Sequence, residues 1–87
     1  MAFIFDLEKN RANMNKHGID FRESYKLWDD PGRKILPGRS LSENRSLMIA
    51  RLGEKHWTAI FTERDDSIRI ISVRRARKKE IELYHEQ

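Results

Sequence analysis

Residues 45–73 read RSLMIARLGEKHWTAIFTERDDSIRIISV, and this stretch decides the fold. Its alternating residues predict one strand over 45–52 and a second over 55–62, joined by a hairpin turn at Gly53-Glu54. A turn over 63–67 then leads into a third strand over 67–73, whose near-continuous apolar run is typical of a central strand. Because the three strands follow one another directly, they predict an antiparallel meander.

Upstream of the meander, residues 3–5 (Phe-Ile-Phe) predict a short strand. Asp6 suits the N-cap of a helix, and Gly18 suits a left-handed C-cap, so we expect a first helix over about 7–17. The apolar face of this helix is poor. It should therefore be only partly buried, or it should present a functional face.

The second predicted helix begins at Asp20-Phe21-Arg22-Glu23, which fits a capping box. A clear amphipathic stripe then runs to Trp28, and Trp28 and Trp57 are both expected in the core because each lies in an apolar stripe. Residues 32–44 predict a loop with a short strand over 34–36, and a last helix should span about 75–84.

These elements predict a single α+β domain of 87 residues. We expect a small antiparallel sheet, made of the short N-terminal strand and the three-strand meander. Two N-terminal helices and one C-terminal helix should pack on it.

Composition limits the protein classes. The chain has no cysteine, which excludes disulfides and thiolate metal sites and favours a reducing compartment. No apolar run approaches the roughly 20 residues of a membrane span, and the N-terminus lacks the features of a signal peptide. We therefore expect a cytoplasmic protein. The formal net charge of +4 favours an anionic partner.

The charge gathers near the C-terminus. Five of the six residues 74–79 are cationic, and they lie where the last strand gives way to the last helix. Cations at a helix N-terminus are disfavoured by roughly 0.3–1 kcal/mol each. A bound anion would compensate them; the alternative is a solvated charge run, partly paired with Glu80 or Glu82.

With Arg64 and Arg69, the segment 64–79 holds seven cations against Asp65 and Asp66, a net +5 that exceeds the charge of the whole chain. Such localised charge is typical of nucleic-acid-binding proteins.

A second candidate site lies on the first helix. Lys9, Asn13, Lys16 and His17 are spaced to form one polar stripe, which could bind phosphates, and His17 could transfer protons near neutral pH. The alternative is that the lysines are solvated and His17 closes the helix end.

Other chemistries lack support in the sequence. Histidines 17, 56 and 85 have no metal-ligand spacing, so we expect neither a metal nor another cofactor. No serine lies in a nucleophile elbow, and residues 37–40 lack the core of a phosphate-binding loop.

Several motifs resemble those of the BrnT toxin family, and the resemblance covers nearly the whole chain. Phe5 departs from the tryptophan common in the family, and residues 32–44 match poorly. The matching motifs are Phe3-x-Phe5-Asp6-x-x-Lys9-x-x-x-Asn13-x-x-Lys16-His17-Gly18-Ile19-x-Phe21, Asp29-Asp30-Pro31, Phe61-Thr62-Glu63-Arg64 and Arg69-Ile70-Ile71-Ser72-x-Arg74-x-Ala76.

The resemblance implies a RelE-like ribonuclease fold and a type II toxin–antitoxin system, in which the toxin cuts RNA and stops translation. It also implies a partner, a BrnA-type antitoxin whose DNA-binding end represses the shared operon.

For such an enzyme, we expect RNA cleavage without metal, through attack of the RNA's own 2′-OH on the adjacent phosphate. Arg64, Arg74 and Arg77 are the candidate clamps for the phosphate and the transition state. Glu63 or His17 is the candidate base, and Tyr84 the candidate acid. The residues expected to bind RNA are Lys9, Lys16, Arg69, Arg75, Lys78 and Lys79.

Two competing functions remain open at this stage. In one, the same basic segment binds nucleic acid or an antitoxin without catalysis. In the other, the chain is a structural interaction protein, whose affinity would not depend on salt as phosphate binding does.

Overall fold

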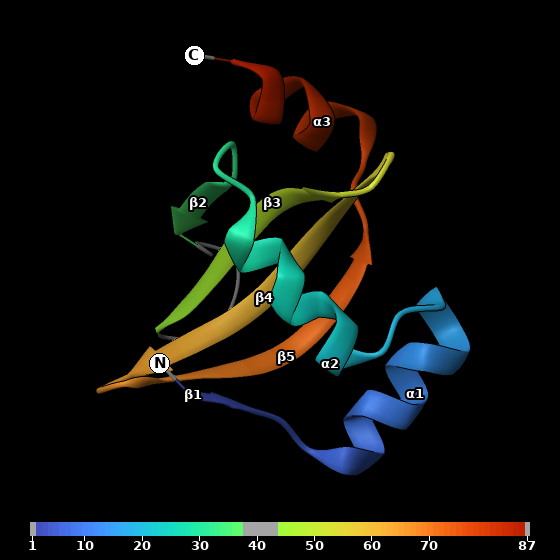
Figure 1. Cartoon of the computed structure of the whole chain (residues 1–87), viewed down its shortest axis with the longest axis vertical. Helices are drawn as coiled ribbons and strands as arrows, with labels where there is room; N and C mark the ends of the chain where they lie inside the picture. The colour runs from blue at the N-terminus through green and yellow to red at the C-terminus, as the bar shows by residue number, and fades with distance from the viewer. Residues whose placement is uncertain (1, 38–43, 87) are drawn as a thin grey trace.

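The computed structural model describes residues 2–37 and 44–86, and the predicted loop residues 38–43 lie outside that part. Figure 1 shows a sheet with helices packed around it. In chain order the elements are β1 (Ala2–Ile4), α1 (Leu7–His17), α2 (Phe21–Ser24), the 3-10 helix η1 (Tyr25–Asp29), β2 (Lys34–Pro37), β3 (Arg45–Leu52), β4 (Lys55–Arg64), β5 (Ser67–Arg75) and α3 (Lys78–His85).

The sheet has five strands in the order β1-β5-β4-β3-β2. The predicted meander is confirmed as β3, β4 and β5, and β2 adds the short strand expected before it. The prediction of a wholly antiparallel sheet is wrong, because β1 pairs with β5 in parallel. The backbone N–H of Ala2 donates to the carbonyl of Asp66 at 2.9 Å, which fixes β1 on the free edge of β5. The α+β class is confirmed, with a mixed sheet.

One face of the sheet carries the core. Figure 1 shows α2 in front of β4 and β5 and α1 beside β5. Phe21, Leu27 and Phe61 are fully buried there, as is most of Trp57, and Trp28 packs edge-on against Phe61 with ring centroids 5.1 Å apart. Both tryptophans therefore pack as expected. Burial of these large apolar side chains is the main stabilising term of so small a domain.

Two buried amides attach α1 to the sheet and to α2. Asn13 Oδ1 accepts a hydrogen bond from the backbone N–H of Val73 at 3.0 Å, and Asn13 Nδ2 donates to the carbonyl of Ile19 at 3.3 Å. Asn10 Oδ1 accepts from the backbone N–H of Phe21 at 2.7 Å. Asn13 therefore satisfies the edge of β5, where a free N–H would be costly.

The caps and bounds of α1 are those predicted, with Asp6 at the N-cap and Gly18 in the left-handed region at φ 75°. Its orientation is unexpected. Asn13 faces the sheet and so lies outside the proposed polar stripe, whereas Leu7 and Met14 face outward with 71% and 48% of their surface exposed. The helix is thus held by hydrogen bonds more than by apolar packing.

Two other predicted bounds are corrected. The second helix is not continuous, because α2 ends at Ser24 and the chain tightens into η1; the Ser24 hydroxyl donates to the carbonyl of Phe21 at 2.6 Å. The last helix begins at Lys78, since β5 continues to Arg75 and the N–H of Ala76 still donates to the carbonyl of His56 at 3.0 Å. The pairing between β4 and β5 therefore extends beyond the apolar run of β5.

Replacement of Asn13 with alanine should lower the free energy of unfolding by about 2–4 kcal/mol, because it leaves a buried N–H and a buried carbonyl unpaired. Denaturant unfolding measures the change. Asn15→Ala, at an exposed position of the same helix, is the matched control and should stay within about 0.5 kcal/mol of the wild type. Equal losses in both variants would contradict the assigned role of the Asn13 amide.

Candidate functional site

The second face of the sheet is only partly covered. Helix α3 lies over its far end, where the hydroxyl of the buried Thr58 donates to Glu80 Oε1 at 2.9 Å. At the opposite end, around Thr62, this face is hollowed by a cavity of about 340 Å³. Its lining residues are Ile4, Arg45, Thr62, Arg64, Ser67, Arg69 and Ile71. We call this space the arginine cavity.

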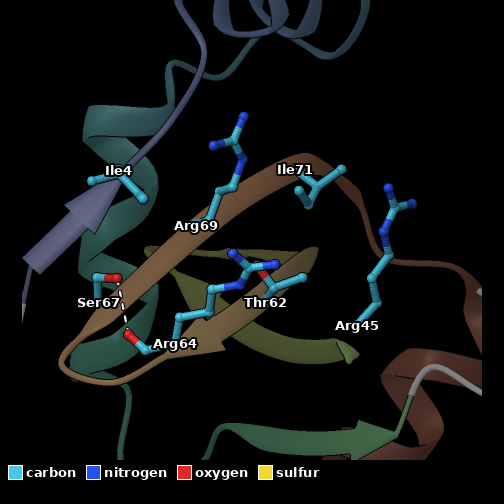
Figure 2. Close-up of a pocket in the computed structure, with 7 residues that line it drawn as sticks. All are labelled: Ile4, Arg45, Thr62, Arg64, Ser67, Arg69 and Ile71. Atoms are coloured by element: carbon cyan, nitrogen blue, oxygen red, sulfur yellow. Dashed lines mark hydrogen bonds between the residues drawn. The ribbon is translucent and has the colours of Figure 1, made fainter. Parts of the chain in front are cut away.

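The register of the strands creates the cavity. Arg45 lies opposite Thr62, Thr62 opposite Arg69, and Arg69 beside Ile4, so these four residues form one row across four strands. Arg64 follows two residues after Thr62, on the same face of β4. Figure 2 shows the three arginines around Thr62. They come from three different strands, and Arg64 lies on the same strand as Thr62, β4.

The tight turn between β4 and β5 positions Arg64. Only Asp65 and Asp66 separate the two strands, and Asp65 takes a positive φ of 51°, as such hairpins require. The Ser67 hydroxyl donates to the carbonyl of Arg64 at 3.0 Å. The end of β4 is therefore held in place, and Arg64 projects from a fixed backbone.

The arginines of the cavity have no close carboxylate partner within the described part of the chain. There, Arg45, Arg64 and Arg69 make no ion pair with a carboxylate, although the pKa of Asp6, which backbone hydrogen bonds lower most, is also lowered by the charge of Arg69. Three guanidinium groups that share one concave surface repel one another, and a ligand with several negative oxygens would relieve this repulsion. Their planar, forked donors match phosphate oxygens in particular.

Arg74 has a different environment. Its guanidinium donates two hydrogen bonds to the Glu80 carboxylate, at 2.8 and 2.9 Å, and both side chains are largely buried. Glu80 also accepts from the backbone N–H of Arg77 at 2.7 Å. The external anion that we expected at this helix N-terminus is therefore not needed there, because the chain's own carboxylate occupies the position.

These contacts change the acidity of Glu80. Burial acts to raise its pKa, but the hydrogen bonds from Arg74, from the Arg77 backbone and from Thr58 prevail and lower the pKa from 4.5 to about 2. Glu80 is thus ionised throughout the neutral range and stabilises α3.

A second cavity, of about 330 Å³, brings together two other predicted site residues, His17 and Arg75. The Arg75 guanidinium lies 5.5 Å from the centroid of the Trp57 ring, in cation–π contact. Burial, with the charges of Lys16 and Arg74, lowers the pKa of His17. His17 should therefore be neutral at pH 7, but it does not line the arginine cavity.

Tyr84 belongs to a separate cluster. Its hydroxyl donates to Asp30 Oδ2 at 2.7 Å, and its ring lies edge-on to His56, with centroids 4.8 Å apart. Burial and the bond to Asp30 raise the pKa of Tyr84. The hydroxyl joins α3 to the end of η1 and lines neither cavity.

The structure therefore brings together Arg64 and Arg69 in one cavity and His17 and Arg75 in another. Arg74 and Tyr84 line neither cavity and are bound as described above. The other predicted site residues are exposed and line neither cavity: Lys9, Lys16, Glu63, Arg77, Lys78 and Lys79.

Sequence reasoning missed Arg45 and Thr62. The turn at Gly53-Glu54 pairs Leu52 with Lys55, and counting outward from it places Arg45 opposite Thr62. The same count from the turn at Asp65-Asp66 places Thr62 opposite Arg69. The strand register set by the two turns was therefore the signal in the sequence that could have identified both residues.

Two absences hold for residues 2–37 and 44–86. They contain no cluster of three or more histidines or carboxylates that could hold a metal ion. None of their helices is long and apolar enough to cross a membrane.

Fold and cavity define the class, a small α+β protein with a cationic site on the open face of its sheet. A comparison with protein families then gives the family: the model of the ribonuclease toxin BrnT, of type II toxin–antitoxin systems, matches residues 5–80. The chain therefore belongs to the BrnT family of ribonuclease toxins. No curated protein matches it. Membership implies an RNA substrate and an antitoxin partner.

The pH dependence of the free energy of unfolding should reveal the contribution of the Arg74–Glu80 ion pair to stability. Because the pKa of Glu80 is lowered from 4.5 to about 2 in the folded state, its stabilising contribution is full above pH 4.5 and is lost as the pH falls toward 2. In Glu80→Gln, the free energy of unfolding should therefore be lower at neutral pH and should fall less between pH 4.5 and 2.

Denaturant unfolding at several pH values makes this measurement. Glu82→Gln is the control, because Glu82 is an exposed carboxylate of the same helix. It should keep the wild-type pH dependence. An unchanged pH dependence in Glu80→Gln would show that the ion pair contributes no net stability.

Proposed function

We propose that this BrnT-family chain cleaves RNA at the arginine cavity, without a metal ion, through attack of the RNA's own 2′-OH. The observation that carries the proposal is the convergence of Arg45, Arg64 and Arg69 on one cavity, where no carboxylate of residues 2–37 and 44–86 forms an ion pair with them. RNA supplies both the nucleophile and the anionic phosphate, so cationic stabilisation is the main contribution required of the protein.

In the proposed step, the 2′-oxygen forms a bond to the adjacent phosphorus while the bond to the 5′-oxygen breaks. The proton of the 2′-OH is lost to a base, and the leaving 5′-oxygen gains a proton. Negative charge grows on the phosphate oxygens in the transition state, where the three guanidinium groups would donate hydrogen bonds. The products are a 2′,3′-cyclic phosphate and a 5′-hydroxyl.

The arginines proposed here to bind the phosphate differ in part from those predicted from the sequence. Arg64 keeps its role, whereas Arg45 and Arg69 take the roles first given to Arg74 and Arg77, since Glu80 already binds the Arg74 side chain and Arg77 does not line the cavity. The proton-transfer candidates His17, Glu63 and Tyr84 do not line the cavity. Charge stabilisation is therefore the contribution that the geometry supports.

The biological setting that we propose follows the family. The fold would be RelE-like, cleavage would stop translation in the cytoplasm, and a BrnA-type antitoxin would neutralise the toxin and repress the operon as a complex. The cationic cavity and the membership of a type II toxin family support this setting.

One observation favours a second function, a nucleic-acid-binding or antitoxin-binding module without catalysis. Among the residues that the structure describes, no histidine or carboxylate lines the arginine cavity, so an obvious general base is missing from this part of its wall. Cleavage assays on purified protein decide between the two functions.

Single replacement of Arg45, Arg64 or Arg69 with alanine should reduce the rate of RNA cleavage by about 10²-fold or more, as expected for loss of a transition-state donor. Arg11→Ala, which removes the same charge from an exposed position of α1, is the control and should keep the wild-type rate. Thermal denaturation should show that all four variants fold. Wild-type rates in the three cavity variants would place the active site elsewhere.

Cleavage in EDTA should proceed at an unchanged rate and should leave 2′,3′-cyclic phosphate ends, which mass spectrometry of the products identifies. RNA with 2′-O-methyl groups should not be cut, because it lacks the nucleophile. Loss of activity in EDTA or the appearance of 3′-hydroxyl ends would contradict the proposed chemistry. Binding without any cleavage would favour the non-catalytic module.

A further inference from the structure

We infer that the arginine cavity also holds one unstacked nucleobase, in contact with the two apolar side chains that line it, Ile4 and Ile71. The ligand is thus a nucleotide of a single-stranded RNA segment, with its phosphate on the arginines and its base on the isoleucines. This inference rests on the proposed function, because it describes how the same cavity would receive the RNA.

The exposure of Ile4 is the first observation. Side chains alternate along β1: Phe3 faces the core and stacks on Tyr25, with ring centroids 4.3 Å apart, so Ile4 faces the open side. There it lies beside Arg69 with 46% of its surface exposed. Figure 2 shows Ile4 at the margin of the cavity, on the strand next to Arg69.

Ile71 reaches the same cavity because β5 is irregular. Phe61 pairs with Ile70 and Ile60 pairs with Ser72, so Ile71 is an extra residue without a partner on β4. Ile70 and Val73 both enter the core, and the two residues between them lie outside it. The bulge therefore adds a second apolar side chain to a cavity whose lining is, apart from Ile4, cationic and polar.

A cavity that bound phosphate alone would not need the two apolar side chains of Ile4 and Ile71. An apolar surface beside cations matches a nucleotide, in which an apolar base face adjoins an anionic phosphate. In a duplex the base faces are covered by stacking, and specific contacts to RNA are made mostly to unstacked single-stranded bases. Between Arg69 and Arg45 in the same row, the Thr62 hydroxyl can donate to or accept from a base edge.

The cavity is large enough for this role. Its volume of about 340 Å³ lies within the usual range for ligand pockets, which starts at roughly 300 Å³. Contact of a base with Ile4 and Ile71 would be stabilised by burial of apolar surface and would discriminate only weakly between bases.

Two fluorescent oligonucleotides of equal length test the inference. Both carry 2′-fluoro sugars, which lack the attacking hydroxyl, and one of them has no bases, so the two share their phosphate charge. By anisotropy, the wild type should bind the base-bearing strand about tenfold more tightly than the abasic strand, since burial of one base face favours it.

In Ile4→Ser this ratio should fall at least threefold, whereas affinity for the abasic strand should stay unchanged. Ile35→Ser is the matched control, because Ile35 is exposed to 49% on β2 and does not line the cavity. It should keep the wild-type ratio. Ile71→Ser provides a second cavity variant if Ile4→Ser unfolds early in thermal denaturation.

Equal affinity of the wild type for the two strands would overturn the base subsite, and so would a wild-type ratio in both cavity variants. RNA cleavage by the same preparation reports the proposed function separately. Cleavage without base discrimination rejects only the subsite. Absence of both cleavage and binding rejects the proposed function and the subsite together.

Discussion

Strand register is the constraint on which the site depends. Two-residue turns close both hairpins of the meander, and each turn allows only one alignment of its strands. A slip by one residue would turn the arginines of the cavity toward the helices and the aromatic core toward solvent. Hydrophobic burial on one face therefore enforces the alignment that gathers cations on the other, and the site needs no contacts of its own to assemble.

Local signals in the sequence were sufficient for the meander, for α1 and for the family. A cap such as Asp6 or a left-handed glycine such as Gly18 acts within one turn of the helix, so its effect can be predicted without tertiary contacts. The buried side of α1 could not be predicted in this way. Asn13 is buried because the edge of β5 offers an unpaired N–H, and that edge exists only in the folded chain.

The site was predicted in part for a similar reason. Counting charges along the sequence drew attention to residues 74–79, but a count does not show which charges already have partners. Glu80 lies one residue beyond that run and binds Arg74, while Arg45 lies far from it in sequence and joins Arg64 and Arg69 across the sheet. Membership of the BrnT family supports an activity on RNA, whereas the assignment of individual residues rests on the register.

The bulge at Ile71 makes the length of β5 as important as its composition. With the extra residue, Ile70 and Val73 both reach the core. Deletion of one residue there would expose one of these two side chains. Otherwise it would shift the start of α3 and separate Glu80 from its hydrogen-bond partners. Natural variation in this strand should therefore rarely insert or delete a residue.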